Sequence, residues 1–155
     1  MDAEHIYTVR AKSTKVRSGI VAPDAVGHPI KFSAPPEFLG ESGMWTPEYF
    51  FVAGVATCFV STFSGMADLS HLEFICVEVE AQGVLEKDPG GWKFTEVKLC
   101  PHLKILLERD RDRAYRLLEK AESACLVARS ITAKVTFESS VVVVPENVNT
   151  ASEIR

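Results

Sequence analysis

TPEYFFVAGVATCF, residues 46–59, is the stretch of sequence that decides the fold. Thr46 is a candidate N-cap, Pro47 suits the first position of a helix, and Glu48 suits its positively polarised first turn. The residues that follow are apolar on nearly every side as far as Leu69. This run is too long for a typical strand, so it predicts a buried helix over residues 46–69.

One face of this expected helix carries small residues around a thiol. Gly54, Cys58, Ser61, Thr62 and Gly65 recur at spacings of three and four residues, which places them on one side of a helix. Small side chains allow a close approach, so we expect another segment to pack near Cys58.

The length of 155 residues and the ordinary balance of apolar and charged residues indicate one globular domain over residues 1–155. We expect its folded core at about residues 5–144 and a flexible tail at 145–155. The net charge of −4 and the lack of a basic cluster argue against nucleic-acid binding. The N-terminus lacks a secretion signal and the longest apolar run is broken by Gly, Thr and Ser, which favours a cytoplasmic protein without a membrane role.

The rest of the sequence predicts strands and one further helix. Expected strands lie at residues 5–16, 20–22, 29–32, 71–86, 92–103 and 131–144. Residues 109–129 return to helical spacing, with Cys125 on the apolar side. The expected fold is therefore α+β, with two helices packed against antiparallel sheet, and Arg17 stands at the tip of the first hairpin.

The four cysteines include no Cys-x-x-Cys pair, so they do not indicate a structural disulfide framework. Cys58 and Cys125 lie on the apolar sides of the two expected helices, where packing makes a pairing plausible without proving it. Cys76 and Cys100 fall in expected strands, which favours a structural role for both. Cys100 and His102 alone are too few ligands for a metal site.

Burial by itself raises the pKa of a thiol, so a reactive Cys58 would need a nearby cation. Arg17 is a candidate because a guanidinium stays charged when buried. Glu48 is placed to hold that arginine by a bidentate pair.

Four local patterns, taken together, identify a family. They are the strand from Tyr7-Thr8 to Arg17-Ser18-Gly19, the helix start Thr46-Pro47-Glu48, the segment 53–59 around Cys58, and the segment 120–130 around Cys125. They resemble the OsmC and organic hydroperoxide resistance (Ohr) family of thiol peroxidases, in the same order of elements over roughly residues 5–144.

This resemblance implies an OsmC-like fold and an intertwined homodimer with each active site at the subunit interface. It implies that Cys58 is the peroxidatic cysteine and Cys125 the resolving one, and that Arg17 and Glu48 activate the thiolate and position the peroxide. No cofactor or metal is implied. The reductant would be an external thiol, for which a dihydrolipoyl group is one candidate.

Departures from the Ohr branch favour the broader OsmC-like branch. The chain has Leu126 and Ala128 where Ohr proteins have Pro and Ser soon after the second cysteine. Organic hydroperoxides are the expected substrates, with Phe50 and Phe51 as expected substrate-binding residues. The alternative is a non-catalytic dimeric module of the same fold that binds a small apolar ligand.

Overall fold

The computed structural model describes residues 3–145. They form two compact units, which meet within one helix between Phe51 and Val52. We call them the N-terminal unit and the C-terminal unit. The single domain expected over residues 1–155 stays a prediction, and nearly all of the expected tail lies outside the described residues.

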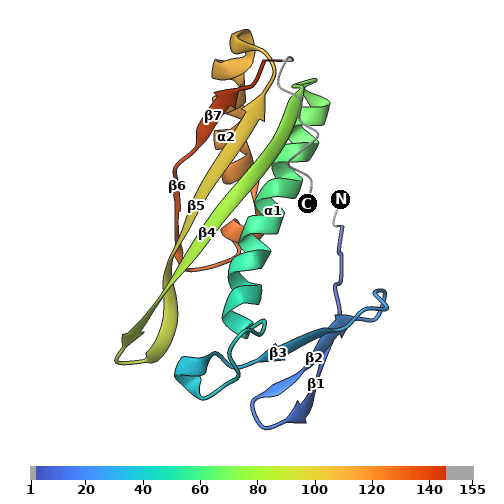
Figure 1. Ribbon diagram of the computed structural model, residues 1–155, viewed down its shortest axis with the longest axis vertical. Helices are drawn as coiled ribbons and strands as arrows, with labels where there is room; N and C mark the ends of the chain where they lie inside the picture. The colour runs from blue at the N-terminus through green and yellow to red at the C-terminus, as the bar shows by residue number, and fades with distance from the viewer. Residues whose placement is uncertain (1–2, 146–155) are drawn as a thin grey trace. The chain divides into compact units, whose positions relative to one another are not determined.

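The N-terminal unit contains a three-stranded antiparallel sheet in the order β1-β2-β3 (Figure 1). The strands are β1 (Val9–Lys15), β2 (Ser18–Pro23) and β3 (Ile30–Ser33), followed by the short 3-10 helix η1 (Pro36–Phe38). Gly19 lets β2 pass close to its neighbours, because a Cβ atom there would lie 2.4 Å from the Lys12 carbonyl oxygen. Every residue of β1 is exposed in the single chain, so both faces of this edge strand are open.

Helix α1 (Pro47–Leu69) begins where the sequence predicts. The backbone N–H of Tyr49 donates to Thr46 Oγ1 at 3.2 Å, which confirms Thr46 as the N-cap. Burial is confined to one stripe of α1, however, formed by Val55, Phe59, Phe63 and Ala67. The helix is therefore not buried on every side within one chain, because the sheet covers only the face that carries this stripe.

Length and composition alone would allow α1 to cross a membrane, with a mean hydropathy of 1.7 in its most apolar window. The core helix of a soluble protein passes the same test. Residues of α1 pack on sheet in the C-terminal unit, which is the arrangement of a core helix.

The C-terminal unit is built on a long antiparallel hairpin, β4 (Phe74–Asp88) and β5 (Gly91–Ile105). The expected closing strand is divided into β6 (Lys134–Phe137) and β7 (Ser140–Val143), and both run parallel to β5. Between them the N–H of Glu138 donates to the Leu99 carbonyl at 2.9 Å, so the chain continues along the same edge of β5.

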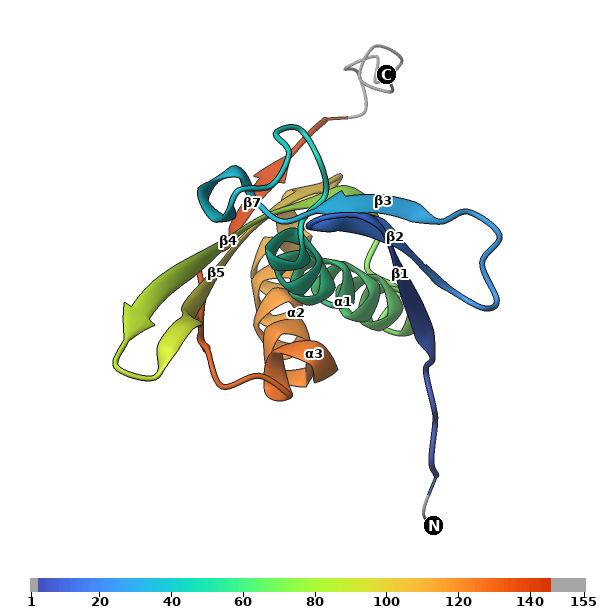
Figure 2. The ribbon, with the colours of Figure 1, turned by 90° about the horizontal axis from the view of Figure 1, so that it is seen from below.

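Helices cover one face of this sheet (Figure 2). On that face Phe59 packs on Phe137 with ring centroids 5.8 Å apart, and Phe63 packs on Phe74 at 5.4 Å. Gly83 admits α1 to the sheet, because a Cβ there would lie 2.6 Å from Val52 Cγ2. The aromatic residues beside Cys58 therefore belong to the core.

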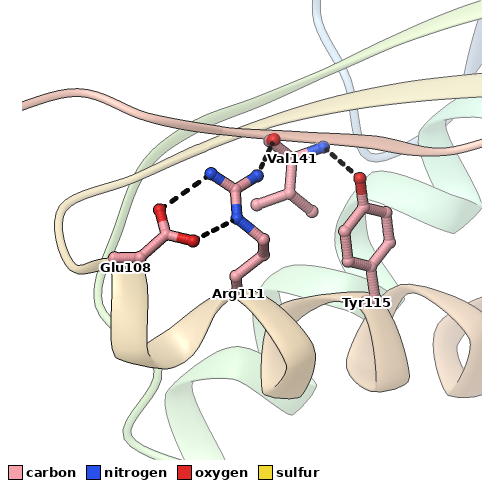
Figure 3. A network of polar contacts seen from close by, with 4 residues as sticks. All are labelled: Glu108, Arg111, Tyr115 and Val141. Carbon is pink, nitrogen blue, oxygen red and sulfur yellow. Dashed lines mark hydrogen bonds and ion pairs between the residues drawn. The ribbon is translucent and has the colours of Figure 1, made fainter.

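Helix α2 (Arg111–Ala124) follows the 3-10 helix η2 (Glu108–Asp110) and is hydrogen-bonded to β7. Arg111 pairs with Glu108 and donates to the Val141 carbonyl at 2.7 Å, while the Val141 N–H donates to Tyr115 Oη at 3.2 Å (Figure 3). These bonds attach the first turns of α2 to β7.

The expected helix over residues 109–129 is interrupted at its far end. Cys125 has an extended backbone, with φ −62° and ψ 107°, and separates α2 from the short helix α3 (Leu126–Arg129). The prediction that Cys125 lies within a continuous helix is therefore wrong. After the interruption, the backbone amides of Leu126 and Val127 lie within reach of the Cys58 sulfur on α1.

Candidate active site

Cys58 on α1 and Cys125 at the α2–α3 junction lie together in the C-terminal unit. Their side chains lie close enough for each thiol to shift the pKa of the other, and both are free thiols. Cys125 is fully buried and its thiol contacts the Val55 carbonyl oxygen at 4.0 Å, whereas Cys58 is half-buried. The structure thus brings together the two cysteines that the sequence singles out.

The small-residue face of α1 is only partly covered. A Cβ added at Gly54 would lie 3.8 Å from Val127 Cγ1, so the junction packs closely there, as expected. Ser61 and Gly65, further along the same face, are exposed. The junction meets α1 at its Gly54–Cys58 end and leaves the rest of this face open in the single chain.

Several donors lower the pKa of Cys58 below that of an ordinary thiol. Burial alone would raise this pKa, but the combined donors outweigh it: the Val127 amide, the Cys125 side chain, the Thr62 hydroxyl and the Leu126 amide. The Thr62 hydroxyl lies 3.9 Å from the Cys58 sulfur. Because donors stabilise the charged form, Cys58 loses its proton more readily than a free thiol does.

The pKa of Cys125 moves the other way. Burial raises it, the neighbouring Cys58 raises it further, and the Ala128 amide offsets this only in part. The pair is therefore asymmetric, with Cys58 favoured as the thiolate and Cys125 as the thiol. This is the division needed between an attacking sulfur and a second sulfur that later closes a disulfide.

Arg17 stands at the tip of the β1–β2 hairpin, as the sequence predicts. Its backbone is left-handed, with φ 63°, and its carbonyl accepts a hydrogen bond from the Ala34 N–H at 2.8 Å. The residue is exposed and borders a pocket of about 300 Å³ in the N-terminal unit. The other residues lining this pocket are Ala11, Lys12, Ser13, Lys15, Ser18, Phe32, Ala34 and Pro47.

Glu48 lies in the first turn of α1, with its Oε2 atom buried and without a hydrogen-bond partner. The ion pairs among residues 3–145 do not include one between Glu48 and Arg17. The bidentate pair expected from the sequence is thus not formed in the single chain. A buried acceptor without a donor is costly, which makes this oxygen available to a cation.

The two phenylalanines expected to bind substrate lie near the start of α1. Phe50 stacks on Trp45, with ring centroids 5.2 Å apart and an angle of 13° between the rings. Phe51 is half-buried. Their contact with a substrate stays a prediction.

The two remaining cysteines lie in the hairpin of the C-terminal unit, Cys76 in β4 and Cys100 in β5. Both are half-buried free thiols. Residues 3–145 contain no group of three His, Cys, Asp or Glu side chains arranged to hold a metal ion.

The backbone donors to Cys58 could not be predicted from the sequence. Amides are not visible in a pattern of side chains, and the segment 120–130 has no Gly or Pro to signal the interruption at Cys125. A signal for Thr62 did exist, since it shares the small-residue face with Cys58. The expectation that Cys58 needs an added cation overlooked these neutral donors.

Comparisons with known proteins agree with this architecture. A family model described as OsmC-like protein matches residues 40–140. The uncharacterized protein YmaD of Bacillus subtilis is 25% identical over 141 residues, covering 88% of this chain and 93% of the relative.

Solved structures extend the likeness to the three-dimensional fold. An organic hydroperoxide resistance protein OsmC from Legionella pneumophila aligns with a TM-score of 0.73 at 27% identity, over 92% of this chain and 100% of that one. The organic hydroperoxide resistance protein OhrB of Bacillus subtilis aligns with a TM-score of 0.64 at 26% identity, over 89% and 98%. These matches confirm the fold expected from the sequence.

Proposed function

The chain belongs to the OsmC-like protein family, and from this premise we propose that it is a thiol peroxidase that reduces organic hydroperoxides to alcohols. The observation that carries the proposal is the asymmetric cysteine pair. Cys58 has a lowered pKa and contacts Cys125, whose pKa is raised. A purely structural pair of core thiols has no need of donors directed at one sulfur.

In the first step the Cys58 thiolate attacks the distal oxygen of the hydroperoxide. The O–O bond breaks, the alkoxide takes up a proton and leaves as the alcohol, and Cys58 becomes a sulfenic acid. Sulfur is oxidised and the peroxide is reduced by two electrons.

In the second step the Cys125 sulfur attacks the sulfenic sulfur. A disulfide forms between Cys58 and Cys125, and the hydroxyl group leaves as water with the Cys125 proton. The raised pKa of Cys125 suits this order, because it keeps the second sulfur protonated while Cys58 reacts. Two external thiol groups then reduce the disulfide by exchange and are themselves joined as a disulfide. A dihydrolipoyl group, which carries two thiols, is one candidate.

We assign Arg17 to the charge that develops on the departing oxygen, a role for which a permanently charged guanidinium is suited. Glu48 would orient that guanidinium through its buried, unpartnered oxygen. Phe50 and Phe51 would favour a peroxide with an apolar substituent over hydrogen peroxide.

We further propose that the protein is a cytoplasmic, intertwined homodimer. The support is the open surface of the single chain, since β1 is exposed throughout and apolar residues of α1 such as Leu69 remain 83% exposed. Multi-angle light scattering on the purified protein checks this, with twice the chain mass expected and the chain mass contradicting it.

The reaction is tested by titrating the reduced protein with cumene hydroperoxide and, separately, with hydrogen peroxide, and mapping thiols by mass spectrometry. The expected product is a Cys58–Cys125 disulfide that forms faster with the organic peroxide, while Cys76 and Cys100 stay reduced. Unmodified Cys58 and Cys125 after exposure to both peroxides would remove the proposal and favour the non-catalytic module.

A further inference from the structure

Two threonines on α1 flank Cys58 and use their hydroxyl groups differently. Thr57 follows the usual pattern of a helical threonine, with its Oγ1 donating to the Ala53 carbonyl one turn back at 2.7 Å. The Thr62 hydroxyl instead lies 3.9 Å from the sulfur of Cys58, one turn earlier. The two side chains are chemically identical, yet only the second is directed at sulfur.

The protonation of Cys58 fixes the direction of this hydrogen bond. A thiolate can only accept, so the Thr62 hydroxyl must be the donor whenever Cys58 is ionised. Hydrogen bonds to a charged acceptor are stronger than neutral ones, so the contact tightens when the proton leaves. The titratable group that contacts Cys58 from the facing element is Cys125, which keeps its proton more tightly than an ordinary thiol.

We propose that Thr62 is a positioning residue for the reacting sulfur, with its hydroxyl holding the Cys58 thiolate on α1 where the sulfur meets Cys125. The hydroxyl and the sulfur share one helix, so their separation is set by a single turn and does not depend on other elements. The consequence for peroxide reduction rests on the proposed function, whereas the hydrogen bond itself can be tested without peroxide.

The chain offers a matched control. Thr62→Val removes the hydroxyl and keeps the branched shape, and valine and threonine have similar helix propensities. Thr57→Val makes the same change one residue before Cys58, where the hydroxyl bonds backbone only. Thr62→Ser restores a hydroxyl at the tested position.

The experiment measures the rate of Cys58 alkylation by iodoacetamide against pH, quantified on the Cys58 peptide with the Cys76 and Cys100 peptides as internal references. Thr62→Val is expected to raise the pH at which Cys58 alkylation reaches half its maximal rate, the midpoint, by about half to one unit. This is the effect expected for the loss of a hydrogen-bond donor to a charged group. Thr57→Val should keep the wild-type midpoint, and Thr62→Ser should recover most of the shift.

Equal midpoints for Thr62→Val and Thr57→Val would overturn the proposal, as would a Thr62→Ser protein that behaves like Thr62→Val. If the valine variant melts early, Thr62→Ala removes the hydroxyl without an added apolar group and gives the same reading. If the wild-type protein does not react with peroxide while Thr62→Val still shifts the midpoint of Cys58 alkylation, that result would support the role of Thr62 and contradict the proposed peroxidase activity.

Discussion

The two units of the chain contribute different halves of the proposed chemistry. In the C-terminal unit the donors to the Cys58 sulfur are already in place, and the pKa of that thiol is lowered by Val127, Cys125, Thr62 and Leu126 against the effect of burial. In the N-terminal unit Arg17 is exposed and Glu48 keeps a buried oxygen without a partner. The donors that lower the pKa of Cys58 therefore lie within one unit, whereas the exposed Arg17 and the unpartnered oxygen of Glu48 lie in the other.

This difference changes the role expected of Arg17. The sequence suggested that the arginine makes Cys58 acidic, but neutral donors of the C-terminal unit already lower its pKa. We therefore expect changes in the C-terminal unit to alter the acidity of Cys58, and changes in the N-terminal unit to alter the reaction with peroxide alone.

The largest effect is expected for Cys125→Ser. Without the second sulfur the disulfide cannot form, so the protein should consume one equivalent of peroxide, stop, and accumulate Cys58 sulfenic acid. A sulfenic-acid trap such as dimedone, followed by mass spectrometry, detects this product. Sustained turnover by the variant at the wild-type rate would show that Cys125 has no resolving role.

Arg17→Ala is expected to slow the reaction with cumene hydroperoxide by about 10²–10³-fold, the usual cost of losing one preorganised donor to a developing charge. Lys12→Ala is the matched control, because it removes another cation that lines the same pocket. Stopped-flow kinetics at one pH compares the two variants. Equal losses in both would mean that Arg17 acts only through the general charge of the unit.

Glu48→Gln is expected to slow the same reaction by about tenfold, because a group that orients a catalytic side chain contributes less than the side chain itself. The amide keeps the size of the carboxylate, so the fold should survive, as a thermal melt can verify. A rate equal to that of wild type would show that Glu48 has no role in the reaction with peroxide.

The smallest effect is expected for Leu126→Pro, which removes one amide donor to Cys58. Leu126 opens α3, where proline is tolerated, and Cys125 already has the extended backbone that precedes proline. The alkylation rate of Cys58 at neutral pH should fall several-fold as its pKa rises, by up to about one unit. Leu126→Ala keeps the amide and trims a side chain that is 67% exposed, so it should behave as wild type.

The sequence predicted the start and end of α1 closely, because a capping threonine, a proline and an acidic residue coincide at its start. It also predicted that a segment would pack near Cys58, since small residues surround that thiol. It missed the interruption at Cys125, where every neighbouring residue is compatible with a helix. It also missed the parallel pairing of β6 and β7 with β5, because the alternation of apolar and polar residues along a strand does not specify which strand it pairs with.

We infer that the acidity of Cys58 is set within the C-terminal unit. The most direct test is the pH dependence of Cys58 alkylation in wild type and in Arg17→Ala. Because the lowered pKa of Cys58 favours the thiolate, the rate should rise with pH and level off below the range of an ordinary thiol, and fall as pH drops below that pKa. The two proteins are expected to share one midpoint, and a midpoint that moves up to the ordinary thiol range in Arg17→Ala would show that Arg17 sets the acidity of Cys58.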